Sequence, residues 1–289
     1  MKVSEILKSS KISIKESQLL LAYLLKCRQE YLISHLELDV KTAIYSKYKV
    51  LERKRLEDWS IAVLIGKKEF FSLEFKVDKN VLVPRPETEL MVEELLSLAL
   101  NENTPSMIID LGTGSGAIII SLAHELSKLN KAIYNKTEFK AIDISSSALK
   151  IARENAKTNK QAKKIDFLLG NLLEPLVNKR DFTKLYSKRL LIAANLPYLS
   201  PLQIKSSPSI SKEPGQALVA GRDGLKCYRE LFNELKTLKL GASVLCEIDD
   251  SQHISISLLA KKYFPHGFIK IKKDLAGKRR LAIIETIIS

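Results

Sequence analysis

The sequence MIIDLGTGSG, residues 107–116, decides the fold of this chain. Its first five residues are apolar except for Asp110, as in a buried strand, and the apolar run 117–129 that follows has the length of a helix. Glycines in a turn between a strand and a helix let the backbone approach a ligand closely. We therefore predict that this loop, with Gly112, Gly114 and Gly116, binds a nucleotide-like ligand.

The loop fits two cofactors, and Asp110 favours one of them. Gly112, Gly114 and Ala117 satisfy the GxGxxG/A pattern of dinucleotide-binding loops, so NAD is one candidate. A carboxylate at the strand end would repel a pyrophosphate, whereas it would attract the cationic amino-acid end and the sulfonium of S-adenosylmethionine. This charge argument favours S-adenosylmethionine. The alternative without a ligand is that Asp110 and Asp143 only cap helices.

Strands and helices alternate on both sides of this loop. Such alternation predicts an α/β fold whose parallel strands are covered on both faces, and the last two strands are close enough to pair antiparallel. Ligands of such sheets bind outside the carboxyl ends of the strands, where Asp143 is expected to accept hydrogen bonds from ribose hydroxyls. The expected strands are 107–111, 139–144, 165–169, 190–194, 242–248, 268–272 and 281–287, and the expected helices are 117–129, 147–158, 225–238 and 252–263.

The tetrapeptide Asn195-Leu196-Pro197-Tyr198 follows the strand 190–194, at the edge where a reactive methyl group is expected. A planar amide or amino nitrogen is a weak nucleophile, so a catalyst has to accept hydrogen bonds from its N–H groups. The side-chain oxygen of Asn195 and the carbonyl of Leu196 are two such acceptors. Pro197 restricts the backbone, and Tyr198 offers an aromatic face to a flat group. Without the glycine loop, the same four residues would indicate only a turn.

Other chemistries find no support in the sequence. None of the four histidines has metal-ligand spacing or an obvious Ser or Cys partner, and the three cysteines form no CxxC pair. We therefore expect no metal site and no hydrolase triad. An NAD oxidoreductase would also lack an evident acid or base for hydride transfer.

The first seventy residues differ from the rest of the chain. They contain one glycine, no proline and leucines at helical spacing, which predicts a small helical domain with helices at 17–27 and 40–56 and a short apolar closing segment at 61–65. Aromatic and β-branched residues then alternate over 69–83, as in a short hairpin. Pro86 and Glu87 suit the first turn of a following helix.

Composition bounds the function classes. The chain has 289 residues, 45% hydrophobic and 28% charged, which excludes a mainly disordered protein. No apolar run approaches the roughly 20 residues of a membrane span. Lysines interrupt the first 17 residues, so we expect no secretion signal and a cytoplasmic protein. The net charge of +14 suits an anionic partner such as nucleic acid. A lysine-rich proteome would explain the same charge equally well, because the lysines are scattered over the whole chain.

Taken together, these motifs resemble the HemK/PrmC family of protein-(glutamine-N5) methyltransferases, which modify peptide chain release factors. The likeness extends over the whole chain. The residues that carry it are 61–66, 68–71, 83–89, 110–116, Asp143, 195–198, 213–214, 216–220, 223–224, Asp274, Ala276, Gly277 and Arg279.

The resemblance implies a seven-stranded Rossmann-like methyltransferase sheet preceded by a helical domain. It divides the chain into a release-factor-recognition domain (1–73), a hairpin linker (74–83) and a catalytic domain that binds S-adenosylmethionine (84–289). The implied substrate is the glutamine of the release factors' GlyGlyGln motif. We expect a monomer that needs neither metal nor nucleic acid. By resemblance, the cofactor residues are Asp110, Gly112, Thr113, Gly114, Ser115, Gly116, Asp143, Leu172 and Asn195, and Arg85, Pro86 and Glu87 join the tetrapeptide in binding substrate.

One departure from the family pattern leaves an alternative open. The usual tetrapeptide is NPPY, and Leu196 replaces its first proline, as in the NLPY of ribosomal RNA adenine dimethyltransferases. A nucleic-acid (rRNA or DNA) adenine N6-methyltransferase is therefore the main alternative, although such enzymes usually begin with their cofactor domain. A non-catalytic RNA-binding protein is less favoured, because the glycine loop, Asn195 and Tyr198 are all intact.

Overall fold

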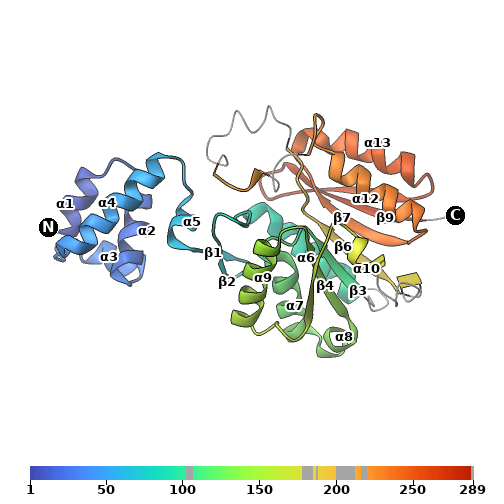
Figure 1. Cartoon of the computed structure of the whole chain (residues 1–289), viewed down its shortest axis with the longest axis horizontal. Helices are drawn as coiled ribbons and strands as arrows, with labels where there is room; N and C mark the ends of the chain where they lie inside the picture. Colours follow the sequence, from blue (N-terminus) through green and yellow to red (C-terminus); the bar gives the residue numbers. More distant parts are fainter. Residues whose placement is uncertain (102–106, 178–184, 187, 200–211, 216–219, 288–289) are drawn as a thin grey trace.

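The computed structural model describes residues 1–101, 107–177, 185–186, 188–199, 212–215 and 220–287 (Figure 1). A seven-stranded sheet forms its centre, with the strand order β5-β4-β3-β6-β7-β9-β8. The strands β5, β4, β3, β6 and β7 are parallel, and β9 runs antiparallel to both β7 and β8. The predicted α/β fold with an antiparallel final pair is therefore confirmed. The strand bounds are β3 (Met107–Leu111), β4 (Glu138–Asp143), β5 (Ile165–Leu169), β6 (Leu190–Ala194), β7 (Ala242–Glu247), β8 (Phe268–Lys273) and β9 (Arg279–Thr286).

Helices cover both faces of this sheet. One core forms where α12 and α13 pack on the sheet, and a second forms beneath α6 and α7 on the other face. Every residue of β3, β6 and β7 is buried, because these central strands are enclosed on both sides. The helix bounds are α6 (Glu89–Asn101), α7 (Ala117–Leu129), α8 (Lys131–Lys136), α9 (Ser146–Thr158), α10 (Glu174–Val177), α12 (Lys226–Thr237) and α13 (His253–Tyr263).

A separate group of helices precedes the sheet domain (Figure 1). It has its own apolar core, centred on Leu20, Leu21 and Tyr48. Helix α2 begins at Ile14, three residues before its predicted start, because the Ser13 hydroxyl accepts a hydrogen bond from the Glu16 amide and forms a capping box. The short helices α1 and α3 were not predicted. The bounds are α1 (Val3–Ser9), α2 (Ile14–Leu25), α3 (Gln29–Ser34), α4 (Thr42–Leu56) and α5 (Ile61–Ile65).

A two-stranded hairpin, β1 (Lys67–Phe70) and β2 (Leu73–Lys76), joins the helical group to the sheet domain. It begins at Lys67, before the expected range 69–83. The sequence pattern missed this start because Lys67 and Lys68 break the apolar alternation. The domain limits at 73 and 83 stay a prediction. Among the described residues, no helix is both long and apolar enough to cross a membrane.

Asn155 of α9 ties this hairpin to the glycine loop. Its side-chain oxygen accepts from the Lys76 amide at 2.7 Å, and its Nδ2 donates to the carbonyls of Lys76 and Ser115 at 3.0 and 2.8 Å. The side chain is buried, so these bonds replace its contacts with water. One residue thus connects β2, α9 and the loop after β3.

Candidate active site

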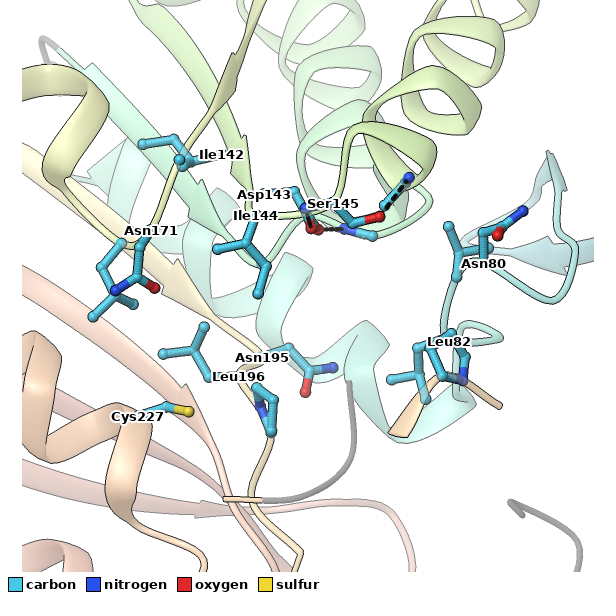
Figure 2. A pocket seen from close by; sticks show the side chains of 18 of the residues that line it. Asn80, Leu82, Ile142, Asp143, Ile144, Ser145, Asn171, Asn195, Leu196 and Cys227 are labelled. Atoms are coloured by element: carbon cyan, nitrogen blue, oxygen red, sulfur yellow. Dashed lines mark hydrogen bonds between the residues drawn. The ribbon is translucent and has the colours of Figure 1, made fainter. Parts of the chain in front are cut away.

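A cavity of about 990 Å³, including space continuous with solvent, opens at the carboxyl ends of β3, β4, β5 and β6. Figure 2 shows Asp143, Asn171 and Asn195 around this space, each at the carboxyl end of a different strand. The lining residues are Asn80, Val81, Leu82, Gly112, Gly114, Ile142, Asp143, Ile144, Ser145, Ala148, Gly170, Asn171, Leu172, Asn195, Leu196, Pro197, Pro214, Cys227 and Glu230.

The glycine loop borders the cavity with its backbone. Gly112 and Gly114 both have positive φ, at +67° and +54°, which glycine adopts without steric cost. A Cβ on Gly112 would lie 3.2 Å from Leu196 Cδ2, so the buried Leu196 side chain packs on this turn. The amide of Gly114 donates to Asp143 Oδ2 at 2.9 Å, which joins the ends of β3 and β4.

Asp110 lies beneath the loop and does not line the cavity. Its Oδ2 accepts from the Thr113 hydroxyl at 2.7 Å, and its Oδ1 has no hydrogen-bond partner among the described residues. Burial raises the pKa of this carboxyl to about 7. Thr113, Ser115 and Gly116 are likewise absent from the lining, so two of the predicted loop residues, Gly112 and Gly114, reach it.

Asp143 ends β4 and does line the cavity. Its Oδ1 accepts from the Ser145 amide at 2.8 Å, and burial raises the pKa of its carboxyl against these hydrogen bonds. The Ser145 hydroxyl in turn caps α9. Asp143 therefore helps to shape the turn into α9, and it also presents a carboxylate at the cavity wall.

The turn after β5 contributes Gly170, Asn171 and Leu172 to the wall. Leu172, predicted to flank an adenine, is buried and has φ +44°, an uncommon value for a residue other than glycine. Asn171 was not predicted from the sequence. The signal available was its position, since it comes just after β5, while Asp143 ends β4 and Asn195 follows β6.

The tetrapeptide follows β6 and brings Asn195, Leu196 and Pro197 to the cavity. The Nδ2 of Asn195 donates to Thr88 Oγ1 at 3.3 Å. Tyr198 lies behind the wall, where its hydroxyl donates to Glu247 Oε1 at 3.1 Å and its carbonyl accepts from Gln252 Nε2 at 2.8 Å. The tetrapeptide is therefore held at both of its ends by side chains from other segments.

Glu247, the last residue of β7, is buried behind Tyr198. Burial raises the pKa of its carboxyl to about 7, while hydrogen bonds from Thr88 and Tyr198 act in the opposite direction. The same buried setting raises the pKa of the Tyr198 hydroxyl. Neither Thr88 nor Glu247 was predicted as a site residue, because no local pattern links the positions 88, 195 and 247.

The predicted substrate residues Arg85, Pro86 and Glu87 lie in and just before the 3₁₀ turn η1 (Pro86–Thr88), outside the cavity wall. Arg85 forms an ion pair with the buried Glu213 at 2.5 Å, and Pro214 next to Glu213 reaches the cavity. Two stretches identified separately in the sequence therefore meet here. Within the second stretch, Gln216, Ala217, Leu218 and Val219 lie outside the described residues.

Arg280 of β9 faces the site, whereas its neighbour Arg279, one of the residues that carry the family resemblance, does not. Arg279 pairs with Asp250 at 3.5 Å near the surface. The Nε of Arg280 donates to Asp274 Oδ2 at 3.2 Å. Burial acts to lower the pKa of Arg280, but this hydrogen bond and the nearby Tyr198 and Glu87 raise it. Neighbouring residues of a strand point to opposite faces, and this decides which arginine faces inward.

These features fit S-adenosylmethionine. Gly112 and Gly114 leave room for close approach, Asp143 can accept hydrogen bonds from hydroxyls, and the partnerless Asp110 Oδ1 is a buried acceptor suited to a cation. Among the described residues, no group of three or more His, Cys, Asp or Glu side chains could hold a metal ion.

Comparison with known proteins agrees with this geometry. A family described as "Methyltransferase domain" matches residues 103–256. The N-terminal domain of human METTL16, solved in complex with SAH, shares the fold with a TM-score of 0.50 at 15% identity, covering 93% of this chain and 94% of that one. The catalytic domain of human Mettl16 with an RNA hairpin gives a TM-score of 0.54 at 15% identity, covering 87% and 84%.

Sequence relatives extend over most of the chain. A release factor glutamine methyltransferase from Enterococcus faecalis is 36% identical, covering 80% of this chain and 77% of the relative. Proteins of the same name from Dictyoglomus turgidum and Bacillus subtilis are 33% and 32% identical, covering 92% and 91% of this chain and 89% and 88% of theirs. This chain therefore belongs to the release factor glutamine methyltransferase family.

Proposed function

We propose that this protein transfers the methyl group of S-adenosylmethionine to the side-chain amide nitrogen of the glutamine in the GlyGlyGln motif of peptide chain release factors. The observation that carries the proposal is the position of Asn195. It lies on the cavity wall with its Nδ2 bonded to Thr88, which leaves Oδ1 as the acceptor for a substrate N–H.

The residues of the tetrapeptide orient the nucleophile. Asn195 Oδ1 and the Leu196 carbonyl accept the two N–H groups of the glutamine amide and turn the nitrogen lone pair towards the cavity. S-adenosylmethionine supplies an electrophilic methyl carbon, so that one N–C bond forms as one S–C bond breaks and S-adenosylhomocysteine leaves. The methylated nitrogen then loses a proton to water. Positioning accounts for most of such catalysis and contributes up to about 7–11 kcal/mol.

The cofactor residues follow from the same arrangement. Gly112 and Gly114 border the methionine part, Asp143 accepts from the ribose, and Leu172 packs on the adenine. We assign Asp110 to the positive charge of the donor, which its buried carboxylate would attract from beneath the loop. Thr113, Ser115 and Gly116 shape the loop from below, since Thr113 bonds to Asp110 and the Ser115 carbonyl accepts from Asn155.

Recognition of the protein substrate involves the entrance and the helical domain. Arg85, Pro86 and Glu87 lie next to Thr88, close to the Asn195 side chain, so they are suited to contact residues flanking the glutamine. The helices of residues 1–73 would hold the body of the release factor. We further propose a cytoplasmic monomer, since this role requires neither a second copy nor a membrane.

Methyl transfer from labelled S-adenosylmethionine to purified release factor tests the proposal, with ribosomal RNA as a parallel substrate. We expect label on the GlyGlyGln glutamine, located by mass mapping. Label on RNA adenine alone would favour the nucleic-acid alternative and overturn the proposal. Label on neither substrate, with donor binding intact, would also contradict it.

The variant Asn195→Ala tests the assigned role of Asn195. Removing a transition-state hydrogen-bonding group should lower kcat about 100- to 1,000-fold while leaving donor affinity largely unchanged. Asn130→Ala is a matched control, because Asn130 caps α8 by accepting from the Ile133 amide at 3.1 Å, away from the cavity. Loss of donor binding in Asn195→Ala would instead indicate a structural role.

A further inference from the structure

A chain of polar side chains runs behind the cavity wall from Asn195 to β7. Asn195 Nδ2 donates to Thr88 Oγ1 at 3.3 Å. Thr88 lies close enough to Glu247 to lower the pKa of its carboxyl, and Glu247 Oε2 has no hydrogen-bond partner among the described residues, so it is open to the Thr88 hydroxyl. Tyr198 donates to the same carboxylate at 3.1 Å. Thr88 and Glu247 are 3% and 2% exposed, so water cannot replace these partners.

The chemistry of these groups fixes the direction of each hydrogen bond. An ionised carboxylate accepts and never donates, so the single hydroxyl proton of Thr88 is directed to Glu247. The oxygen of Thr88 is then left as an acceptor towards Asn195. An asparagine amide meets such an acceptor with its NH₂ group, which turns Oδ1 away from Thr88.

We propose that Thr88, held by Glu247, is the positioning residue that fixes Asn195 as a hydrogen-bond acceptor towards the substrate. This inference rests on the proposed function and deepens it, because it explains why the site selects a substrate nitrogen that carries N–H groups. If the amide were flipped, Asn195 would present a donor to the cavity and would repel such a nitrogen. The Glu247 carboxylate therefore sets the orientation of the Asn195 amide through Thr88.

Three distant segments have to meet for this device to form. Thr88 ends η1, Asn195 follows β6 and Glu247 ends β7. Strands β6 and β7 are paired in parallel, so their carboxyl ends emerge side by side. This gives the stretch around residues 85–89 a role inside the site, in addition to its place at the entrance.

The charges around Glu247 are those of Glu87 and Arg280. Burial and the charge of Glu87 both raise the pKa of Glu247, whereas the charge of Arg280 lowers it. The pKa of about 7 means that Glu247 is largely ionised above neutral pH. Assays at about pH 8.5 therefore test the arrangement with the carboxylate in its acceptor-only form.

The test compares Thr88→Val with Thr88→Ser. Valine keeps the shape of threonine but removes the hydroxyl, whereas serine keeps the hydroxyl. We expect Thr88→Val to lower kcat about 10-fold, the effect of about one lost hydrogen bond in the transition state, with KM for release factor and donor Kd within about twofold. Thr88→Ser should retain kcat within about threefold of the wild type.

Glu247→Gln provides a second variant that preserves size. Its NH₂ group can donate to Thr88 Oγ1, which frees the Thr88 hydroxyl to donate to Asn195 Oδ1 and reverses the chain. We expect a fall in kcat of about 10-fold or more with donor Kd unchanged. Thermal unfolding of each variant identifies loss of folding as a separate cause.

Two results would overturn the inference. One is a kcat of Thr88→Val within about twofold of the wild type while Asn195→Ala is inactive, which would mean that Asn195 is oriented without Thr88. The other is equal loss in Thr88→Ser and Thr88→Val, which would indicate packing. Failure of the wild-type protein to label the glutamine would instead refute the proposed function, so the two failures are distinguishable.

Discussion

The substitution Gly224→Ala tests how the tetrapeptide is held in place. Gly224 has φ +69°, and a Cβ there would lie closer than 3.0 Å to the Tyr198 carbonyl oxygen and to Gln252 Nε2. These two atoms are themselves hydrogen-bonded at 2.8 Å. Real Cβ atoms do not approach so closely, so the backbone of Tyr198, the side chain of Gln252 or both have to move.

Gly277 provides a matched control for the size of the effect. It also has positive φ, at +79°, but a Cβ added there would meet no atom within 4 Å. Alanine in left-handed backbone costs about 1–2 kcal/mol at either site. At Gly224, loss of the Gln252 hydrogen bond and the buried groups left unpaired add about 1–3 kcal/mol. At roughly 3 °C per kcal/mol, Tm should fall by roughly 6–15 °C for Gly224→Ala and 3–6 °C for Gly277→Ala.

Thermal unfolding followed by circular dichroism measures this difference, and initial rates of methyl transfer below both Tm values measure its effect on the site. A displacement of about 1 Å at Asn195 or Pro197 should lower kcat about 100-fold in Gly224→Ala, while Gly277→Ala keeps its rate. Equal losses of Tm and equal rates in the two variants would refute the reasoning, because contact with Tyr198 would then have no consequence.

Three further outcomes follow from the buried groups. Folding raises the pKa values of Asp110 and Glu247 to about 7, so each carboxyl stabilises the folded state below about pH 4, and this stabilisation is lost as the pH rises through 7. By linkage, each carboxyl contributes about 3–4 kcal/mol to the free energy of unfolding at low pH, and Tm measured against pH tests this. If Asp110 pairs with the cationic donor, affinity for S-adenosylmethionine should rise with pH through about 7, and Asp110→Asn should abolish this dependence in calorimetric titration. Asn155→Ala removes the hydrogen-bond partner of Lys76 and of the Ser115 carbonyl. It should therefore lower the free energy of unfolding by about 2–4 kcal/mol, measured with urea, and weaken donor binding. Unchanged donor affinity would contradict the connection between Asn155 and the glycine loop.

The sequence by itself determined the sheet, the glycine loop and the edge at which the site lies. Local patterns suffice for these features. Apolar strands alternate with helices, and a strand, a glycine turn and a helix follow one another within the single stretch 107–129. Asp143 and Asn195 could be located on the cavity because Asp143 ends a strand and Asn195 directly follows one, at carboxyl ends that were predictable. Leu172 was expected there only from the family resemblance.

Tertiary structure alone decided which side chains support those residues. Thr88, Glu247, Gln252 and Asn155 act through partners at least 40 positions away, and no local periodicity records such contacts. It also distinguished Arg280 from Arg279, which differ by one position in the pleat of β9. The physical reason is that a strand or turn is specified by neighbours in sequence, whereas the direction of a hydrogen bond at Asn195 depends on a carboxylate that only folding brings near.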